Sequence, residues 1–337
     1  MKEAWLYENL DERRVRCHLC AHRCIIADGK RGICGVRENT GGALYSLVYG
    51  RPISQAVDPI EKKPLFHFYP GSTSYSIATV GCNFRCRFCQ NADISQMPRD
   101  QGRIDGGSAS PEEVVANAQA YGCKSISYTY TEPTIFFEYA RDIAILAHRA
   151  GLANNCVPNG YMTGEMLEAF YPYLDAANVD LKAFRDEFYR QQCGARLQPV
   201  LDSLRLMKQQ GIWVEVTTLI IPGLNDDRGE LRELAGFIAG ELGAATPWHV
   251  SRFHPTYQLM DRGSTPEKTL EAAYAIGKEA GLRYVYVGNV AGAQGESTYC
   301  YNCGKCIIGR VGFSVRDRHV RDGKCEFCGA AIDGVGL

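Results

Sequence analysis

The sequence has no long apolar run, since no stretch approaches the roughly 18 apolar residues that predict a membrane-spanning helix. Its N-terminal stretch, MKEAWLYENLDERRVRCHLC, lacks the uninterrupted apolar core of a signal peptide. It also lacks an excess of either charge, because 37 Lys and Arg against 38 Asp and Glu leave a formal net charge of −1. These absences predict a cytoplasmic globular protein without a membrane partner; binding of nucleic acid through a local basic patch stays open.

The chain is rich in cysteine, with 15 in 337 residues. The cytosol keeps thiols reduced and the count is odd, so metal ligation explains these cysteines better than a disulfide framework. Most of them fall into three groups that lie near the start, within the first third and at the end of the chain. The grouping predicts a Cys-rich metal-binding element over residues 1–45, a body over 70–292 and a second Cys-rich element over 295–337.

The body alternates strand-like apolar runs with helical patterns. One helix start is explicit, because Ser110, Pro111 and Glu113 stand at the N-cap, first-turn and capping-box positions. Repeated units of this kind predict an α/β fold with a parallel sheet, in which either a barrel or an open doubly wound sheet fits the pattern. Polar side chains follow several strands, where an α/β barrel has its active site. They are Glu132, Asn159, Asp180, Lys182, Thr217, His254 and Asn289.

Three cysteines, Cys82, Cys86 and Cys89, lie in the stretch GCNFRCRFCQN directly after a strand-like run. Thiolates bind zinc or iron–sulfur clusters, and a structural zinc site is closed by a fourth ligand that is usually nearby. The next cysteine, Cys123, is a full βα unit away. A [4Fe–4S] cluster held by three cysteines leaves one iron for an exogenous ligand. The spacing therefore favours a catalytic cluster over a zinc site completed from afar, and an electron-transfer ferredoxin, with four cysteines per cluster, fits poorly.

This stretch resembles the signature of the radical S-adenosylmethionine (SAM) enzymes. The resemblance covers about residues 75–290 and is nearest to the activating enzymes of pyruvate formate-lyase. With both Cys-rich ends included, the chain is similar to the radical SAM family of the AmmeMemoRadiSam gene system. The resemblance implies a partial (β/α)6 TIM-like barrel, and a [4Fe–4S] cluster whose open iron is chelated by the amino and carboxylate groups of SAM.

The chemistry implied by the resemblance is that of an oxidoreductase. A low-potential donor such as flavodoxin or ferredoxin reduces the cluster, SAM is cleaved to methionine and a 5′-deoxyadenosyl radical, and the radical abstracts hydrogen from a substrate. That substrate is unassigned. The nearest relatives imply one alternative, the installation of a glycyl radical on a partner protein. A zinc-dependent binding module is a hypothesis from another class, but it would not need the large α/β body.

The resemblance also implies roles for single residues. Glu132, in TYTEP, matches the acid of a Gly-Gly-Glu-Pro-like segment that contacts the SAM amino group, although both glycines are lost here. Asp180 and Lys182, in VDLK, match a pair that faces SAM, with the lysine suited to its carboxylate. His254, in FHP, matches a histidine near the adenosyl group. The plainer alternatives are a strand-end charge, an internal ion pair and a structural histidine.

Two further positions carry open alternatives. The activating enzymes have an Asp-Thr before an Asn-Gly, and the Asp helps to bind a monovalent cation. Here Val157 and Pro158 precede Asn159, so no cation site is predicted. Asn159 is a candidate to contact the SAM ribose or carboxylate, or it belongs to a simple turn. Cys193 is a candidate catalytic thiol that donates hydrogen to a substrate radical, or a small buried hydrophobic residue.

The two terminal cysteine groups predict further metal sites. Near the C-terminus, two C-x2-C-G knuckles separated by a strand-like run predict a zinc ribbon, with Cys306 as a spare thiol. Its ligands are Cys300, Cys303, Cys325 and Cys328. In the N-terminal group, zinc and an auxiliary [4Fe–4S] cluster both fit the spacing, and His18 and His22 add possible ligands. Its thiols are Cys17, Cys20, Cys24 and Cys34.

Overall fold

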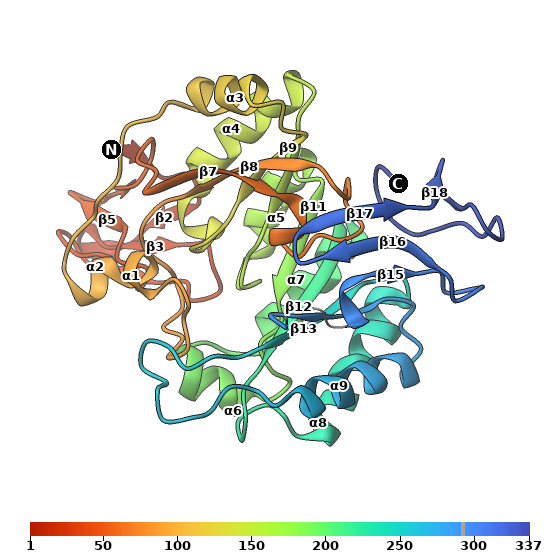
Figure 1. Ribbon diagram of the computed structural model, residues 1–337. Coiled ribbons are helices and arrows are strands. Elements are labelled where there is room, and N and C mark those ends of the chain that lie inside the picture. The colour runs from red at the N-terminus through yellow and green to blue at the C-terminus, as the bar shows by residue number, and fades with distance from the viewer. Residues whose placement is uncertain (291–293) are drawn as a thin grey trace.

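The computed structural model describes residues 1–290 and 294–337, and its centre is an eight-stranded sheet (Figure 1). The strand order is β14-β13-β12-β11-β10-β9-β8-β7, in which β8 to β14 run parallel and β7 runs antiparallel to β8. The strands are β7 (Ser54–Pro59), β8 (Thr73–Ala78), β9 (Ser125–Tyr128), β10 (Ala153–Cys156), β11 (Ala176–Asp180), β12 (Trp213–Ile220), β13 (Trp248–Arg252) and β14 (Val285–Gly288). Within the described ranges no backbone pairing joins β7 to β14, so the sheet is open rather than a closed barrel.

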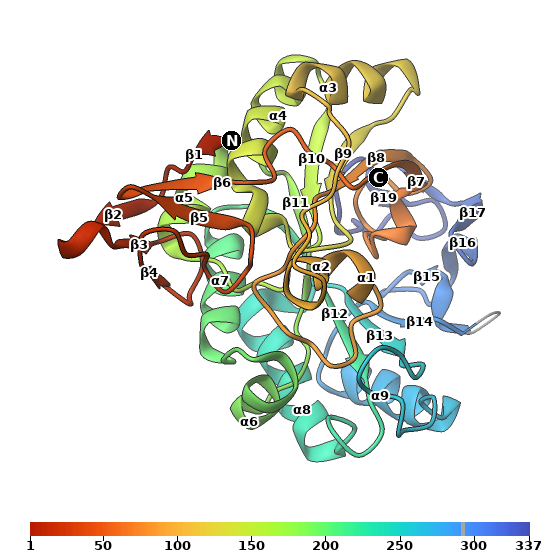
Figure 2. The ribbon, with the colours of Figure 1, turned by 90° about the vertical axis from the view of Figure 1, so that its left-hand side faces the viewer.

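Each connection between successive parallel strands carries a helix, and the helices surround the sheet in Figure 2. They are α3 (Pro111–Ala120), α4 (Phe137–Arg149), α5 (Gly164–Phe170), α7 (Gln198–Gln209), α8 (Arg228–Phe237) and α9 (Glu267–Glu279). The capping box predicted for α3 is present, since Ser110 Oγ accepts from Glu113 N at 3.2 Å and Ser110 N donates to the Glu113 carboxylate at 2.7 Å. The alternation of strand and helix confirms the α/β class. No described helix combines the length and the apolar character needed to cross a membrane.

The N-terminal element consists of two small sheets, β1-β6-β5 and β2-β3-β4. Their strands are β1 (Lys2–Glu3), β2 (Tyr7–Asn9), β3 (Val15–Cys17), β4 (Ile25–Ile26), β5 (Arg37–Thr40) and β6 (Ala43–Ser46). A buried ion pair ties them to the body, because Arg37 Nη1 and Nη2 each lie 2.8 Å from a carboxylate oxygen of Glu138 on α4. Both side chains are about 2% exposed, so this charge-assisted pair is shielded from solvent.

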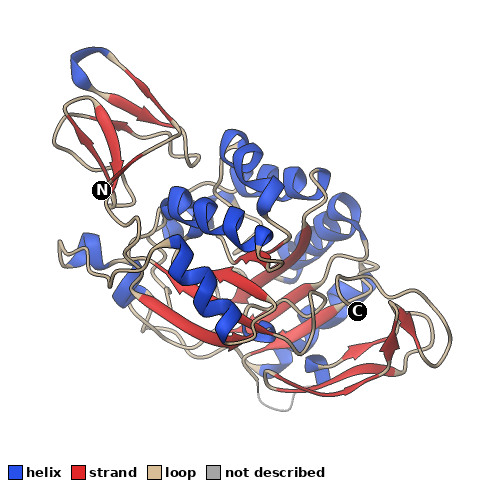
Figure 3. Cartoon of the chain, turned by 90° about the horizontal axis from the view of Figure 1, so that it is seen from above, coloured by secondary structure: helices blue, strands red, loops and turns tan. Residues whose placement is uncertain are grey.

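The C-terminal element is a small antiparallel structure that lies away from the N-terminal element in Figures 1 and 3. It contains β15 (Thr298–Tyr299), β16 (Cys306–Val311), β17 (Ser314–Arg318), β18 (Val320–Arg321) and β19 (Lys324–Cys325). Arg310 fixes it to the body: its guanidinium donates to Phe66 O at 2.7 Å and lies 3.5 Å from Glu61. The predicted division of the chain into 1–45, 70–292 and 295–337 stays a prediction. Strand β7 belongs to the central sheet although it precedes residue 70. The predicted end of the body, residue 292, lies outside the described residues.

A buried carboxylate ties the segment between β7 and β8 to the sheet. Glu215, on β12, accepts hydrogen bonds from Phe66 N at 3.1 Å, His67 N at 2.8 Å and His249 Nε2 at 2.7 Å. Burial raises the pKa of Glu215, but His249 and the other donors outweigh this and hold the pKa below its ordinary value. The carboxylate is therefore a charged acceptor for several buried donors.

Replacing Glu215 by leucine is expected to lower the free energy of unfolding by about 3–5 kcal/mol, because the substitution leaves buried donors without an acceptor. Urea denaturation followed by circular dichroism measures the effect. The matched control is Glu241→Gln, since Glu241 is a half-exposed partner of Arg205 and its loss costs at most about 1 kcal/mol. Equal decreases in the free energy of unfolding of the two variants would contradict the stabilising role of Glu215.

Candidate active site

The loop that carries Cys82, Cys86 and Cys89 follows β8 and packs against the N-terminal element. Its first residue explains the local sequence, since Gly81 has φ +99°. A Cβ at this position would lie 2.8 Å from a methyl group of Val36 and 3.0 Å from the carbonyl oxygen of Cys34. Only glycine combines this backbone conformation with such a close approach.

The far side of the same loop is held by the short helical segment Tyr189–Cys193. Arg85 N donates to Cys193 O at 2.8 Å, and Arg87 N donates to Gln192 O at 3.0 Å. Cys193 also lies beside Cys86, and its interaction with the Cys86 sulfur is the largest reason that the pKa of Cys86 is lowered. The loop is thus held from both sides by backbone and side-chain contacts.

The three cysteines line a cavity of about 410 Å³ at the carboxyl ends of the parallel strands. This volume is within the usual range for a small-molecule site. Four of the predicted site residues line the same cavity, namely Glu132, Asn159, Asp180 and Lys182, and so do Thr217 and Asn289. The tertiary structure therefore brings together residues that are up to about 200 positions apart in the chain. The sequence predicts this grouping, because polar residues that follow parallel strands meet at the carboxyl ends of those strands.

Glu132 and Asn159 meet on one wall of the cavity. Glu132 accepts from Thr134 N at 3.0 Å and from Asn159 N at 2.8 Å, and burial raises its pKa to about 7. The side-chain amide of Asn159 donates to Asn83 Oδ1 at 2.7 Å and lies 4.0 Å from Cys82 Sγ. This wall therefore presents a buried carboxylate beside the first cysteine of the loop.

Asp180 and Lys182 form an ion pair, with Lys182 Nζ 2.9 Å from Asp180 Oδ2. Burial alone would lower the pKa of Lys182, but the charges of Asp180 and Cys86 raise it well above its ordinary value. The lysine therefore stays protonated. The cavity has an anionic wall at Glu132 and a cation at Lys182, which suits a ligand that carries both an ammonium and a carboxylate.

Two predicted residues do not line this cavity. His254 is exposed, and its Nδ1 lies 3.0 Å from Ser264 Oγ. Cys193 is fully buried and lies beside Cys86, behind the loop. The roles proposed for these two side chains stay predictions. The contact of Cys193 with the cysteine loop has no signal in the local sequence, because the two segments are a hundred residues apart.

Other cavity residues were missed by sequence reasoning. Asn91, within the cysteine motif, donates to Tyr130 O at 2.8 Å, where Tyr130 has φ +64°. Asn178 accepts from Thr217 Oγ1 at 2.7 Å. Phe313 reaches the cavity from the hairpin between β16 and β17 of the C-terminal element. The position of Asn91, two residues after Cys89, is a local signal that it lies at the cavity. No residue near Phe313 in the sequence indicates that Phe313 reaches the cavity.

The thiols of the chain differ in how closely they converge. Those of Cys300, Cys303, Cys325 and Cys328 all lie within 4.8 Å of one another, with two of the S···S distances at 3.7 and 3.9 Å. A tetrahedral ion with Zn–S bonds of about 2.3 Å separates its ligands by about 3.8 Å, so these thiols fit one metal ion.

The loop that carries Cys82, Cys86 and Cys89 has a different geometry. Across residues 1–290 and 294–337, no other three Cys, His, Asp or Glu ligand atoms lie as close together as the C-terminal thiols. Cys82, Cys86 and Cys89 nevertheless face one cavity. Three spread thiols fit a [4Fe–4S] cluster, in which each thiolate binds a different iron.

Comparisons with known proteins agree with this geometry. The model of the radical SAM superfamily matches residues 76–235. An uncharacterized protein of Methanocaldococcus jannaschii is 49% identical over 335 residues, which cover 99% of each chain. The pyruvate formate-lyase-activating enzyme of Clostridium pasteurianum is 25% identical over 164 residues, or 47% of this chain and 66% of that one. A radical SAM methyltransferase structure from Sphaerobacter thermophilus shares the fold, with a TM-score of 0.52 at 16% identity over 71% of each chain.

Proposed function

The chain belongs to the radical SAM superfamily, and we propose that it is an enzyme that cleaves SAM reductively and abstracts hydrogen from a substrate held over the 410 Å³ cavity. The observation that carries this proposal is that Cys82, Cys86 and Cys89 line one cavity together with Glu132 and Lys182. When bound, the cluster supplies the low-potential electron that breaks the sulfonium bond and so generates a hydrogen-abstracting radical. A donor such as flavodoxin or ferredoxin would provide that electron.

The residues of the chain bind and orient the cofactor. Glu132 is the acceptor for the ammonium group of SAM, because it is a buried carboxylate whose remaining contacts are neutral donors. Lys182 is a protonated donor for the SAM carboxylate, with Asp180 setting its position. Asn159 links the carboxylate wall to the cysteine loop through Asn83. Phe84 and Phe88, both buried, line the cavity and exclude water from its wall.

The direct test is anaerobic reconstitution with iron and sulfide, followed by SAM and dithionite. We expect 5′-deoxyadenosine as a product, measured by chromatography and mass spectrometry. A preparation that contains the iron–sulfur cluster but forms no 5′-deoxyadenosine would rule out this function.

Glu132 makes SAM binding depend on pH. Its pKa of about 7 means that the carboxyl is neutral below this pH and charged above it. Affinity for SAM is therefore expected to increase as the pH rises through about 7, since only the charged form pairs fully with an ammonium. In Glu132→Gln we expect the affinity above pH 7 to fall by roughly 10–100-fold, as about 1.5–3 kcal/mol of charged hydrogen bonding is lost.

Equilibrium binding of SAM to the reconstituted protein, measured across this pH range, checks the expectation. Glu132→Gln should also lose most of the pH dependence, whereas the surface control Glu241→Gln should keep it. A pH dependence that is equally steep in Glu132→Gln would assign the titration to another group.

One class of substrate is favoured by the comparisons as a second candidate. Relatives named as activating enzymes match about half of this chain at 25% identity, and their names include benzylsuccinate synthase activating enzyme of Thauera aromatica. On this basis the substrate would be a glycine in a partner protein. Incubation of the reduced enzyme and SAM with such a partner should then yield an organic radical signal in electron paramagnetic resonance. Product formation from a small molecule without that signal would favour the first candidate.

We propose that the C-terminal thiol group binds zinc, and its S···S distances of 3.7 and 3.9 Å support this. Its role is structural, since four protein ligands close the site. Through Phe313 the element also forms part of the cavity wall.

A further inference from the structure

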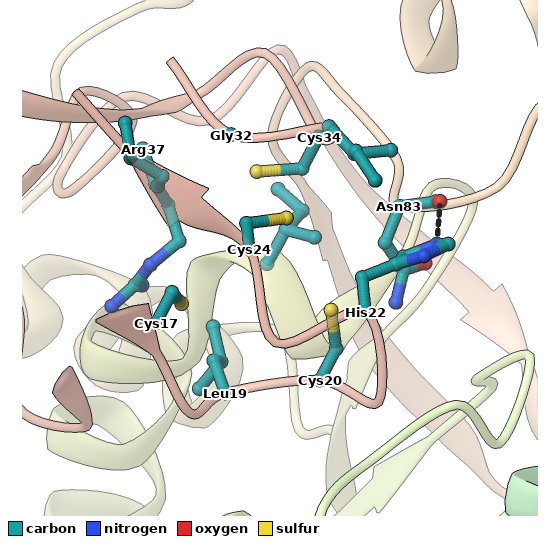
Figure 4. A pocket seen from close by; sticks show the side chains of 12 residues that line it. Cys17, Leu19, Cys20, His22, Cys24, Gly32, Cys34, Arg37 and Asn83 are labelled. Atoms are coloured by element: carbon teal, nitrogen blue, oxygen red, sulfur yellow. Dashed lines mark hydrogen bonds between the residues drawn. The ribbon is translucent and has the colours of Figure 1, made fainter. Parts of the chain in front are cut away.

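The N-terminal cysteines surround an internal space. Cys17 ends β3, Cys20 and Cys24 lie in the connection from β3 to β4, and Cys34 lies shortly before β5. All four line a cavity of about 20 Å³, and Figure 4 shows their side chains arranged around it. A space of roughly 10–15 Å³ already holds a water molecule, so the four cysteines leave room between them for a metal centre.

The spacing of these thiols differs from that of the C-terminal group. The C-terminal ligand atoms lie within 4.8 Å of one another, as a single tetrahedral ion requires. In the part of the chain that the structure describes, no three ligands of the N-terminal group meet this spacing. Thiols that line one cavity without converging on one point fit a polynuclear cluster, because each iron of such a cluster is bound by a different thiolate.

Two buried donors at this cavity point to an acceptor inside it. Arg37 uses Nη1 and Nη2 for Glu138, while its Nε has no hydrogen-bond partner among the described residues. The Nδ2 of Asn83 is likewise buried and unpartnered within the described chain. Both residues line the cavity, and Arg37 and Asn83 are 2% and 1% exposed. Leaving such groups unsatisfied is costly, so the cavity is suited to an anionic group with several hydrogen-bond acceptors, such as cluster sulfides.

The nearby histidines are already engaged elsewhere. His22 Nε2 donates to the carbonyl oxygen of Asn83 at 2.8 Å, drawn as the dashed line in Figure 4. His18 Nδ1 lies 2.7 Å from Arg23 Nη1. The thiols of the four cysteines remain as ligands at this cavity. A cationic metal centre would stabilise their thiolates, and the four cysteines supply its ligands.

We propose that Cys17, Cys20, Cys24 and Cys34 hold a second [4Fe–4S] cluster, ligated at all four irons, rather than a zinc ion. Its site lies against the catalytic loop. Cys34 O approaches Gly81 closely, and Asn83, the residue after Cys82, presents Nδ2 at the N-terminal cavity while its Oδ1 accepts from Asn159. The two clusters would therefore share a wall formed by residues 81–83.

The decisive experiment leaves the N-terminal group intact. The triple variant Cys82→Ala/Cys86→Ala/Cys89→Ala is purified and reconstituted anaerobically, and its iron, sulfide and zinc are counted. We expect about four irons with a [4Fe–4S] Mössbauer spectrum and about one zinc, against about eight irons in the wild type. A triple variant with no iron and about two zinc ions would overturn the proposal.

A second variant removes the N-terminal thiols and keeps the cysteines of the loop. Cys20→Ala/Cys34→Ala is expected to lose about four irons and to keep the catalytic cluster and the zinc. The matched control, Cys123→Ala, removes a buried thiol outside all three groups and should change no metal content. If the double variant fails to fold, the triple variant still decides the question. Wild-type iron that falls from about four to none in the triple variant overturns the second cluster and leaves the proposed function standing.

Discussion

Replacing Cys86 by alanine is expected to abolish the cleavage of SAM and to remove about four irons from the reconstituted protein, because two thiolates do not hold the catalytic cluster. Cys86 is the middle cysteine of the loop and is 7% exposed. Its sulfur interacts with Cys193, and it lies close enough to Lys182 for the two charges to interact.

The measurements are 5′-deoxyadenosine formation under dithionite and iron content in the same preparation. Cys123→Ala is the matched control, since it also removes one buried thiol but lies in the connection between α3 and β9, away from the loop. It should keep the wild-type iron and product. Formation of 5′-deoxyadenosine by Cys86→Ala at the wild-type rate would contradict the assignment of the cluster to this loop.

Removing the C-terminal metal is expected to unfold residues 298–337. A structural zinc of this kind contributes an apparent ~10–16 kcal/mol to the folding of its segment. The segment's own buried core consists of a few small or medium side chains, and two of these, Cys300 and Cys325, are proposed zinc ligands. The variant Cys300→Ser/Cys325→Ser should therefore lose about one zinc and expose this region to proteolysis.

Limited proteolysis and hydrogen exchange locate the effect, and metal analysis confirms the loss of zinc. The control is Cys306→Ser, because Cys306 lies on β16 next to the site but outside the four converging thiols. It should keep the metal. Unfolding should also leave the Glu61 carboxylate without Arg310, so that the melting temperature of the body falls as well. A protected C-terminal segment in the metal-free variant would refute the structural role.

Much of the body was predictable because its signals are local. The capping box at Ser110 and Glu113 and the apolar runs that become β8 to β14 depend on neighbouring residues, so periodicity alone indicates a parallel α/β fold. Periodicity did not decide between a barrel and a flat doubly wound sheet. That difference lies in strand order and closure. The strands β8 to β14 follow one another in sequence without the reversal of a doubly wound sheet, and within the described residues no pairing joins β7 to β14, so the arrangement is that of a partial barrel that is not closed.

The candidate site was likewise predicted only in part from the sequence. The loop cysteines and the strand-end residues Glu132, Asn159, Asp180 and Lys182 were predicted, and they line one cavity. Strand ends in a parallel sheet meet at one edge, which makes such residues predictable as a group. Phe313, the contact of Cys193 with Cys86, and the exposed position of His254 follow from the packing of distant segments, so no local pattern indicates them.

The three cysteine groups show what the sequence and the tertiary structure each decide about the proposed metal sites. The sequence by itself determined which thiols belong together, because ligands a few residues apart in C-x3-C-x2-C or C-x2-C patterns are held near one another by the chain. The tertiary structure decided how far those thiols stand apart and what surrounds them. The C-terminal group converges within 4.8 Å, whereas the N-terminal group faces a cavity with Arg37 and Asn83 on its wall. Metal identity depends on ligand separation and on buried donors, and both are properties of the packed chain.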